Sequence, residues 1–227
     1  MRHEWLHPDN YKIKITTLNG LSVVIRLIND SYILPIGSVE FMKKSAEILG
    51  IELPKPLNIP SELFDFCDRK VWNCNIKEVN YPCFIKPLEE AKLFTGFVAK
   101  NENSLSLYYK DLADFDGMVQ CSEILENIVS EWRCFILNGK VLNCSNYSGD
   151  PLIFPDSKKI NFLIEKYKNS PSGYALDVAV LDNNETVLME VNDGFALGNY
   201  GCDPEDYFKI LKKRWFEIVK SSIEKNG

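Results

Sequence analysis

Histidine is scarce in this chain, and several common catalytic motifs are missing. The two histidines, His3 and His7, both stand near the start of the sequence. This argues against a Ser-His-Asp or Cys-His enzyme, because those sites need a histidine beside the nucleophile. The chain also contains no Gly-x-Gly-x-x-Gly pattern and no Walker A loop, so it lacks the usual glycine-rich phosphate-binding loops.

Long apolar runs and an excess of positive charge are missing too. No apolar stretch approaches the length that crosses a bilayer, and the polar start has no signal-peptide core. Lys and Arg number 26 against 32 Asp and Glu, which leaves a net charge of −6. An acidic chain is a poor candidate for a nucleic-acid binder, whose affinity comes largely from neutralising phosphates. We expect a soluble, cytoplasmic protein with neither nucleic-acid nor membrane partners.

No two cysteines form a Cys-x-x-Cys pair, although the chain has seven cysteines. Neither a zinc knuckle nor a thioredoxin-like motif is therefore present. The number is odd, and most of these residues fall in stretches that look like strands. We expect free thiols in a reducing compartment.

The chain does have enough apolar sequence for a real core: 45% of its 227 residues are hydrophobic, which suits one large or two small domains. In the first third, Ser38 is the expected cap of a helix that Gly50 ends. The expected elements are strands at 11–16 and 22–27 around a turn at 18–20, a strand at 32–36, a helix at 39–49, a linker at 53–60 and a short helix at 61–68.

The remainder alternates strands with helices. Asn138-Gly139 predicts a tight hairpin that sets Leu137 opposite Lys140 and Arg133 opposite Cys144. Antiparallel hairpins in a mixed order predict an α+β fold rather than a doubly wound parallel sheet. The expected elements are strands at 71–79, 83–86 and 118–121, hairpins at 129–147 and 174–192, and helices at 156–169 and 204–223.

The second hairpin carries the most chemical information. If Leu181 pairs with Thr186, Asp177 lies directly opposite Glu190. Alternation then puts one set of side chains on the accessible face (Ala175, Asp177, Ala179, Leu188, Glu190 and Asn192) and an apolar set on the core face (Leu176, Val178, Val180, Val187, Met189 and Val191).

Facing carboxylates destabilise a sheet unless a cation lies between them. Oxygen ligands without histidine or cysteine favour Mg²⁺, so Asp177, Glu190 and Asn192 are the predicted metal ligands. The alternative is an ordinary polar strand surface that faces solvent.

Lysines mark a second candidate cluster. Lys86 ends an apolar strand, where a lysine is costly without an anionic partner. Lys92, Thr95 and Gly96 follow in a loop that could close over phosphates with lysine charge and backbone N–H groups. The alternative for Lys86 is a strand-end lysine that reaches solvent.

A third cluster is Glu131-Trp132-Arg133, whose two charged side chains share a strand face. The Arg133 guanidinium could meet a carboxylate or a phosphate, or it could form an ion pair with Glu131. Just before it, residues 120–124 run from a strand into a turn and could offer backbone groups to a planar base.

Together, and in this order, the motifs resemble those of ATP-grasp enzymes, from about residue 71 to the last helix. The chain is most similar to a small subfamily found in phages and bacteria. The motifs that carry this resemblance are Gly-Ser-Val-Glu-Phe at 37–41, Lys86-Pro87, Lys-Leu-Phe-Thr-Gly at 92–96, Glu-Trp-Arg at 131–133 and Glu-Val-Asn-Asp-Gly at 190–194.

The resemblance implies ATP sandwiched between two α+β subdomains, at 71–118 and 119–227, after a short N-terminal α/β region at 1–70. Arg133 and Lys92 would act at the transferred phosphoryl group. Asp177, Glu190 and Asn192 would bind Mg²⁺. The implied nucleotide contacts are Lys86, Lys92, Thr95 and Gly96 for the phosphates and Gln120, Cys121, Ser122 and Glu123 for the base, with Arg69 and Lys70 as further sources of charge.

The reaction implied by the resemblance is an ATP- and Mg²⁺-dependent ligation of a carboxylate to an amine through an acylphosphate. Its substrates would be small molecules or peptides. Two alternatives stay open. One is a catalytically silent ATP-binding regulatory or interaction protein. The other is an ATP-dependent kinase that stops at the phosphorylated product.

Overall fold

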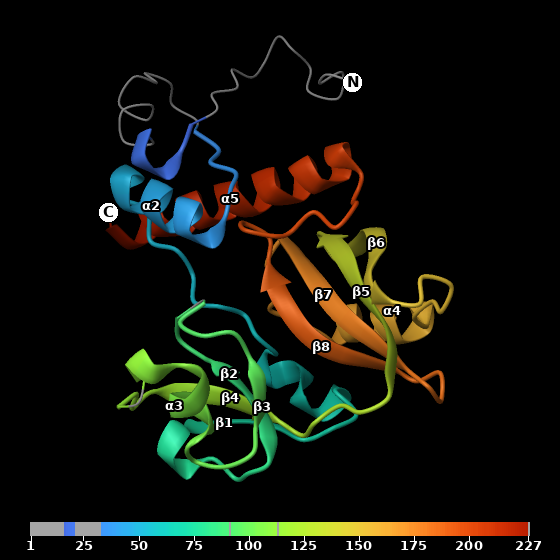
Figure 1. The fold of residues 1–227 in the computed structure, drawn as a ribbon. Helices are drawn as coiled ribbons and strands as arrows, with labels where there is room; N and C mark the ends of the chain where they lie inside the picture. Colours follow the sequence, from blue (N-terminus) through green and yellow to red (C-terminus); the bar gives the residue numbers. More distant parts are fainter. Residues whose placement is uncertain (1–15, 21–32, 91, 113, 227) are drawn as a thin grey trace.

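Two antiparallel four-stranded sheets organise the chain (Figure 1). The computed structural model describes residues 16–20, 33–90, 92–112 and 114–226. The predicted α+β class is confirmed. The small sheet has the order β1 (Val71–Asn75), β4 (Met118–Ser122), β2 (Cys83–Pro87) and β3 (Phe97–Ala99), and the large sheet has the order β6 (Lys140–Gly149), β5 (Ile128–Leu137), β7 (Gly173–Leu181) and β8 (Thr186–Asp193).

Helices cover both sheets. The α-helices are α2 (Val39–Leu49), α3 (Ser104–Tyr108), α4 (Ser157–Lys166) and α5 (Pro204–Asn226). The 3₁₀ helices are η1 (Leu18–Gly20), η2 (Ser61–Phe66), η3 (Ile76–Glu78) and η4 (Lys110–Leu112). No helix among the described residues is long and apolar enough to cross a membrane.

The large sheet is packed on both faces. Leu176, Val178 and Leu188 join Ile160 and Leu163 of α4 in the main core, where all five are buried. On the opposite face, Phe135 of β5 and Ala175 of β7 pack against Ile210 of α5. Helix α5 in turn packs on α2, and the two lie side by side in Figure 1.

Strand alternation gives the small sheet two different faces. Cys83 and Ile85 of β2 and Val119 of β4 are fully or almost fully buried in a separate core cluster. Their neighbours Phe84 and Lys86 point to the other face, toward the large sheet. The period of two therefore turns one face of the small sheet into a wall of the space between the sheets.

The N-terminal predictions are tested only in part. Helix α2 begins and ends as expected, with the Ser38 side chain accepting the Phe41 N–H and Gly50 in the left-handed region at φ 68°. The strands expected at 11–16 and 22–27 lie almost wholly outside the described residues. The strand expected at 32–36 is wrong for residues 33–36, which have no regular structure; the Ile33 carbonyl accepts a bond from Trp215 on α5 instead.

Other differences are local. The strand expected at 71–79 ends at Asn75, whose side chain accepts the Lys77 N–H and starts η3. The helix expected at 61–68 is the 3₁₀ helix η2, which Pro60 precedes. The chain passes from the small sheet to the large one between β4 and β5.

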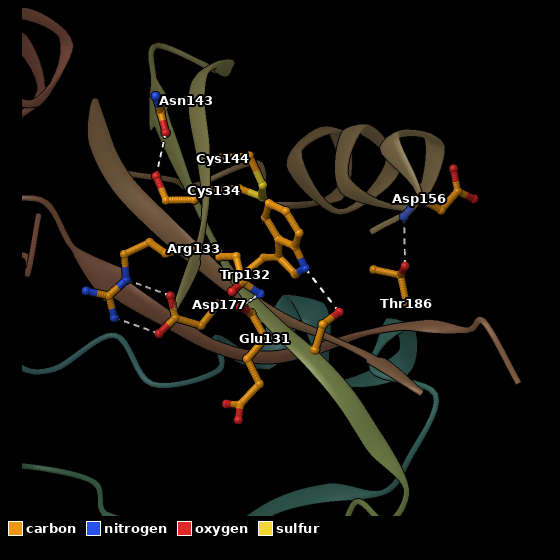
Figure 2. Close-up of a disulfide and its surroundings, with 12 residues drawn as sticks. Glu131, Trp132, Arg133, Cys134, Asn143, Cys144, Asp156, Asp177 and Thr186 are labelled. Atoms are coloured by element: carbon orange, nitrogen blue, oxygen red, sulfur yellow. Dashed lines mark hydrogen bonds and ion pairs between the residues drawn. A yellow bond between two sulfur atoms is a disulfide. The ribbon is translucent and has the colours of Figure 1, made fainter. Parts of the chain in front are cut away.

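The first hairpin contains two register shifts, and Tyr147 is the extra residue on β6 at the shift between Glu131 and Trp132. Leu137 lies opposite Lys140 as expected, but the register shifts between Phe135 and Ile136, so Arg133 faces Ser145 rather than Cys144. The same shift puts Cys134 directly opposite Cys144, with 4.1 Å between their Cα atoms. These two cysteines form a disulfide, shown in Figure 2, so the expectation of seven free thiols is wrong for this pair.

The second hairpin contains a compensating bulge. Thr186 pairs with Val180 rather than with Leu181, but an extra residue on β8, Met189, restores the predicted Asp177–Glu190 pairing. The predicted faces are wrong near the turn. Leu188 belongs to the core cluster, whereas Met189 lines the space between the two sheets.

Candidate active site

A pocket of about 210 Å³ lies between the two sheets. Both sheets and the connection from β4 to β5 contribute to its walls, together with the residues just before the small sheet. The lining residues are Ile59, Arg69, Phe84, Lys86, Val98, Gln120, Cys121, Ser122, Glu123, Ile124, Leu125, Ile128, Tyr147, Asp177, Met189 and Glu190.

Part of the pocket wall is apolar. Phe84 comes from the small sheet, Met189 comes from the large one, and Ile124 and Leu125 belong to the connection from β4 to β5. Gly96 supports this wall, because a Cβ at that position would lie 2.5 Å from Cζ of Phe84. The arrangement leaves an apolar space that suits a flat ring system.

Another part of the pocket wall carries carboxylates, and cationic side chains neutralise them. Arg133 donates from Nε and Nη2 to the two oxygens of Asp177, at 2.7 and 2.6 Å, as Figure 2 shows. Lys86 Nζ lies 2.6 Å from Glu190 Oε1. The facing carboxylates that predicted a cation are thus each held by a cationic side chain, one from each sheet.

Burial and charge act in opposite directions on this cluster. Burial raises the pKa of the Asp177 carboxyl, while the hydrogen bonds and charge of Arg133 oppose that shift and the charge of Glu190 adds to it. Burial alone would lower the pKa of Arg133, but its bonds to Asp177 outweigh that effect and raise it. Arg133 and Asp177 therefore form a tight buried pair beside a second, more open one.

The chemistry of the donor set fits a hard divalent cation. Asp177, Glu190 and Asn192 offer two carboxylates and an amide oxygen, and Asn192 Nδ2 already donates to Asp177 at 3.0 Å. No cluster of three or more His, Cys, Asp or Glu side chains suited to a metal occurs in the described part of the chain. Mg²⁺ held here would take its remaining ligands from phosphates and water, as is common for this ion.

Two alternatives raised by the sequence can be judged from these contacts. Glu131 accepts a bond from the Tyr147 hydroxyl at 3.1 Å and points away from Arg133 in Figure 2, so the proposed ion pair between Glu131 and Arg133 is not formed. The Lys86 side chain is only 14% exposed, so it is not a lysine that simply reaches solvent.

The loop between β2 and β3 lies outside the pocket walls. Lys92 is exposed, with φ 62°. Hydrogen bonds from the Glu40 backbone and from Ser38 lower the pKa of Glu40 on α2, and the charge of Lys92 lowers it further. The Thr95 backbone N–H donates to the Tyr109 hydroxyl. The predicted phosphate residues of this loop are therefore near the site in sequence but do not line the pocket.

The acidic residues of the same loop are paired away from the site. Glu89 lies 2.8 Å from Lys55 of the linker, and Glu90 lies 3.1 Å from Lys43 of α2. Their charges are thus partly neutralised by lysines on neighbouring segments. This reduces the repulsion that two carboxylates beside Lys92 would exert on a bound anion.

The residues expected to surround a base differ in their contacts and burial. Both ends of the Gln120 amide bond to the backbone of Ile59, at 2.9 and 2.8 Å, so Gln120 fastens the linker to β4 and shapes the pocket wall. Cys121 is fully buried. The Ser122 hydroxyl donates to the Glu123 carbonyl, and Glu123 exchanges two hydrogen bonds with the Lys70 backbone.

Arg69 is the most unusual residue of the pocket. Its Nη1 donates to the Leu188 and Cys67 carbonyls, but its buried Nε has no hydrogen-bond partner among the described residues, and no carboxylate is bonded to it. Burial lowers the pKa of this guanidinium. A cation that is desolvated but not paired is what an anionic ligand would complete.

Sequence reasoning missed the pocket residues contributed by distant elements. Tyr147 and Met189 were not predicted, because they enter the pocket through the bulges of β6 and β8. Ile59 was assigned only to a linker. A signal for Arg69 exists in the sequence, because Arg69 and Lys70 place two cationic side chains just before β1.

The fold is that of an ATP-grasp domain. A family model described as "ATP-grasp domain, R2K clade family 2" matches residues 66–210, well over half of the chain. The chain therefore belongs to the R2K clade of ATP-grasp domains. No curated protein sequence matches it significantly.

Solved structures with a similar fold are remote in sequence. The D-alanine–D-alanine ligase of Bacillus anthracis is 16% identical, with a TM-score of 0.46 and coverage of 84% of this chain and 69% of that one. The D-alanine–D-alanine ligase of Coxiella burnetii is 13% identical, with a TM-score of 0.46 and coverage of 91% of this chain and 65% of that one. The N5-carboxyaminoimidazole synthetase of Staphylococcus aureus is 13% identical, with a TM-score of 0.41 and coverage of 89% of this chain and 57% of that one. The chain thus spans 57% to 69% of the length of these three proteins.

Proposed function

We propose that the protein is an ATP- and Mg²⁺-dependent ligase that joins a carboxylate to an amine through an acylphosphate. One observation carries the proposal: in a member of the ATP-grasp family, a pocket between two sheets combines apolar side chains with carboxylates that are paired with cations. Such a lining suits a base against the apolar side chains and phosphates beside the cationic ones. The expected boundary between subdomains 71–118 and 119–227 would divide β4, which belongs to the small sheet, so we place the boundary after Ser122, with an N-terminal region at 1–70.

In this proposal the base lies between Phe84 and Met189, against residues 120–123. Lys86 and Arg69 both line the pocket and would contact the phosphate chain, and Lys92 would join them if its loop closes over the phosphates together with Thr95 and Gly96. The unpartnered Nε of Arg69 supports this assignment, because an anion would satisfy it.

Asp177, Glu190 and Asn192 are the residues that would hold Mg²⁺. The ion would supply neutralisation of phosphate charge. Arg133 and Lys86 already neutralise the same carboxylates, so both cations would be free to turn toward phosphate oxygens once the carboxylates have another partner. Arg133 and Lys92 would then stabilise charge on the transferred phosphoryl group.

The proposed chemistry needs no nucleophile from the protein. An oxygen of the acid substrate attacks the γ-phosphorus of ATP, and ADP leaves. The amine then attacks the acyl carbon, inorganic phosphate leaves, and the amine loses a proton. A chain whose only histidines are His3 and His7 is suited to this reaction, because cationic side chains and positioning supply most of the catalysis.

Calorimetry and product analysis test the proposal. A non-hydrolysable ATP analogue with Mg²⁺ should bind, and ADP should form only when a suitable acid is present. Hydroxylamine traps an acylphosphate as a hydroxamate, so it serves as a general amine while the natural one is sought. Failure of the nucleotide to bind would contradict the proposal.

The ion pairs of the two carboxylates give specific support to one alternative, a catalytically silent nucleotide-binding protein. Because Arg133 and Lys86 already occupy Asp177 and Glu190, the protein could bind nucleotide and remain catalytically silent. If the protein binds nucleotide but releases no ADP with any acid and amine that is added, the result would favour that function. ADP release with an acceptor but no hydroxamate would favour a kinase.

A further inference from the structure

The chain makes a short exposed turn at residues 198–201, after β8. Buried residues anchor both ends of the turn: Leu197 is 6% exposed and Cys202 is 3% exposed. The Tyr207 hydroxyl of α5 donates to the Leu197 carbonyl at 2.6 Å, and the Cys202 N–H donates to the Asn199 carbonyl at 2.9 Å. The tip is thus exposed but held in place on both sides.

Tyr200, in this turn, has a backbone conformation that bulky residues rarely adopt. Its φ is 44°, in the left-handed region, and the next residue, Gly201, also has a positive φ, of 82°. A tyrosine in that region is strained, and such strain is found where the surrounding structure requires one particular side-chain placement.

The strained backbone places the Tyr200 ring over Arg133. The Arg133 guanidinium lies 4.6 Å from the ring centroid, within the range of a cation–π contact. The turn also approaches Arg133 through the Gly198 carbonyl, which accepts from Nη1 at 3.4 Å. A Cβ on Gly198 would stand 3.0 Å from the Tyr200 ring, so a glycine permits this close approach.

A second aromatic ring supports the first. Tyr147 of β6 packs against Tyr200 with 5.1 Å between ring centroids and an angle of 33°. Tyr147 also lines the pocket. The Tyr200 hydroxyl makes no hydrogen bond within the described part of the chain, so its ring rather than its polar group forms the contacts.

We propose that Tyr200 is a positioning residue that holds the Arg133 guanidinium against Asp177 at the end of the pocket. Asp177 fixes two nitrogens of the guanidinium, Gly198 accepts from the third, and the Tyr200 ring covers the plane. The use of this arrangement in phosphoryl transfer rests on the proposed function, whereas the positioning itself does not.

Solvent exchange of the Arg133 Nε–H, followed by ¹H–¹⁵N NMR, tests the positioning without any nucleotide. Tyr200→Leu removes the aromatic face and should raise the exchange rate about two- to fivefold, the factor for a cation–π contact at a partly exposed site. Tyr200→Phe keeps the ring and should leave the rate unchanged. Tyr108→Leu, at a tyrosine that is 67% exposed on α3, is the matched control and should also leave it unchanged.

Two results would overturn the proposal: an unchanged rate in Tyr200→Leu, or an equal rise in Tyr200→Phe. If Tyr200→Leu fails to fold, Tyr200→Gly decides in its place, because glycine adopts the left-handed conformation without strain and still removes the ring. An unchanged rate in Tyr200→Gly would overturn the positioning role as well.

Turnover separates the positioning role from the proposed function. Where the wild type releases ADP, Tyr200→Leu should lower kcat about two- to fivefold while the Kd of the ATP analogue stays the same. A changed Kd with unchanged kcat would contradict the role assigned to Tyr200. If the wild type binds no nucleotide, the proposed function fails, and the exchange rates still decide whether Tyr200 positions Arg133.

Discussion

Two buried arginine–aspartate pairs in this protein have nearly the same geometry and different surroundings. Arg133 binds Asp177 and Arg214 binds Asp193, in each case from Nε at 2.7 Å and from Nη2 at 2.6 Å. The first pair borders the pocket. The second joins α5 to the end of β8 and does not line the pocket.

The partners around each pair distinguish their roles. Arg214 also reaches Glu217, which in turn accepts two bonds from Ser172, so the second pair ends in a closed network. Asp177 instead faces the like charge of Glu190 across the sheet and borders open space. A closed network indicates a structural pair, whereas a pair with a like-charged neighbour can exchange its partner.

Breaking the structural pair should have the largest effect. Arg214→Met leaves Asp193 buried without a cation, and we expect the free energy of unfolding to fall by about 3–5 kcal/mol. Urea denaturation measures this loss. The Kd of the ATP analogue in protein that remains folded should not change, because Arg214 is not part of the pocket.

The matched variant at the pocket is Arg133→Met. Asp177 would keep the bond from Asn192, and water could reach it from the pocket, so we expect a smaller loss of about 1–3 kcal/mol. An equal or larger loss for Arg133→Met than for Arg214→Met would contradict the distinction between the two pairs.

The next effect concerns the carboxylate itself. Asp177→Asn should lower the rate of ADP release by about 10²–10³-fold, the usual size of a lost electrostatic contribution to phosphoryl transfer. Asp182→Asn, at the hairpin turn, is the control and should keep the wild-type rate. Full activity in Asp177→Asn would remove this residue from the proposed metal ligands.

A smaller effect is expected for Lys86, the cation that pairs with Glu190. Lys86→Met should weaken binding of the ATP analogue by about 1.5–3 kcal/mol, the range for a hydrogen bond to a charged group. Lys92→Met should weaken it less, because Lys92 is exposed and outside the pocket walls. Calorimetry compares the two, and the opposite order would show that the loop closes fully over the phosphates.

Local patterns in the sequence predicted the hairpins but not the contacts between them. Asn138-Gly139 correctly set Leu137 opposite Lys140, because a two-residue turn determines the pairing next to it. The bond between Arg133 and Asp177 joins β5 to β7, strands that are not consecutive in the chain. No local turn determines their register, so the sequence could not show which carboxylate Arg133 meets.

The prediction that Asp177 faces Glu190 is confirmed, although the pairing from which it followed is wrong. The turn pairs Thr186 with Val180, and the bulge at Met189 shifts the register back by one residue. Leu188 is fully buried in the core, and its packing there forces the extra residue outward. The predicted ligands thus came from alternation, and the pocket residue Met189 came from a bulge that alternation does not predict.

The smallest expected effect tests the network behind Arg214. Burial alone would raise the pKa of Glu217, but bonds from Ser172 and the charge of Arg214 outweigh it and lower the pKa. A carboxyl with a lowered folded-state pKa adds stability above its unfolded-state pKa, and that contribution is lost as the pH falls through the folded-state value.

Glu217→Gln should therefore be less stable than the wild type at pH 7, and the difference should shrink as the pH is lowered past the ordinary glutamate range. Urea midpoints of both proteins across that range provide the measurement. A difference that stays constant with pH would mean that Glu217 acts through its hydrogen bonds alone.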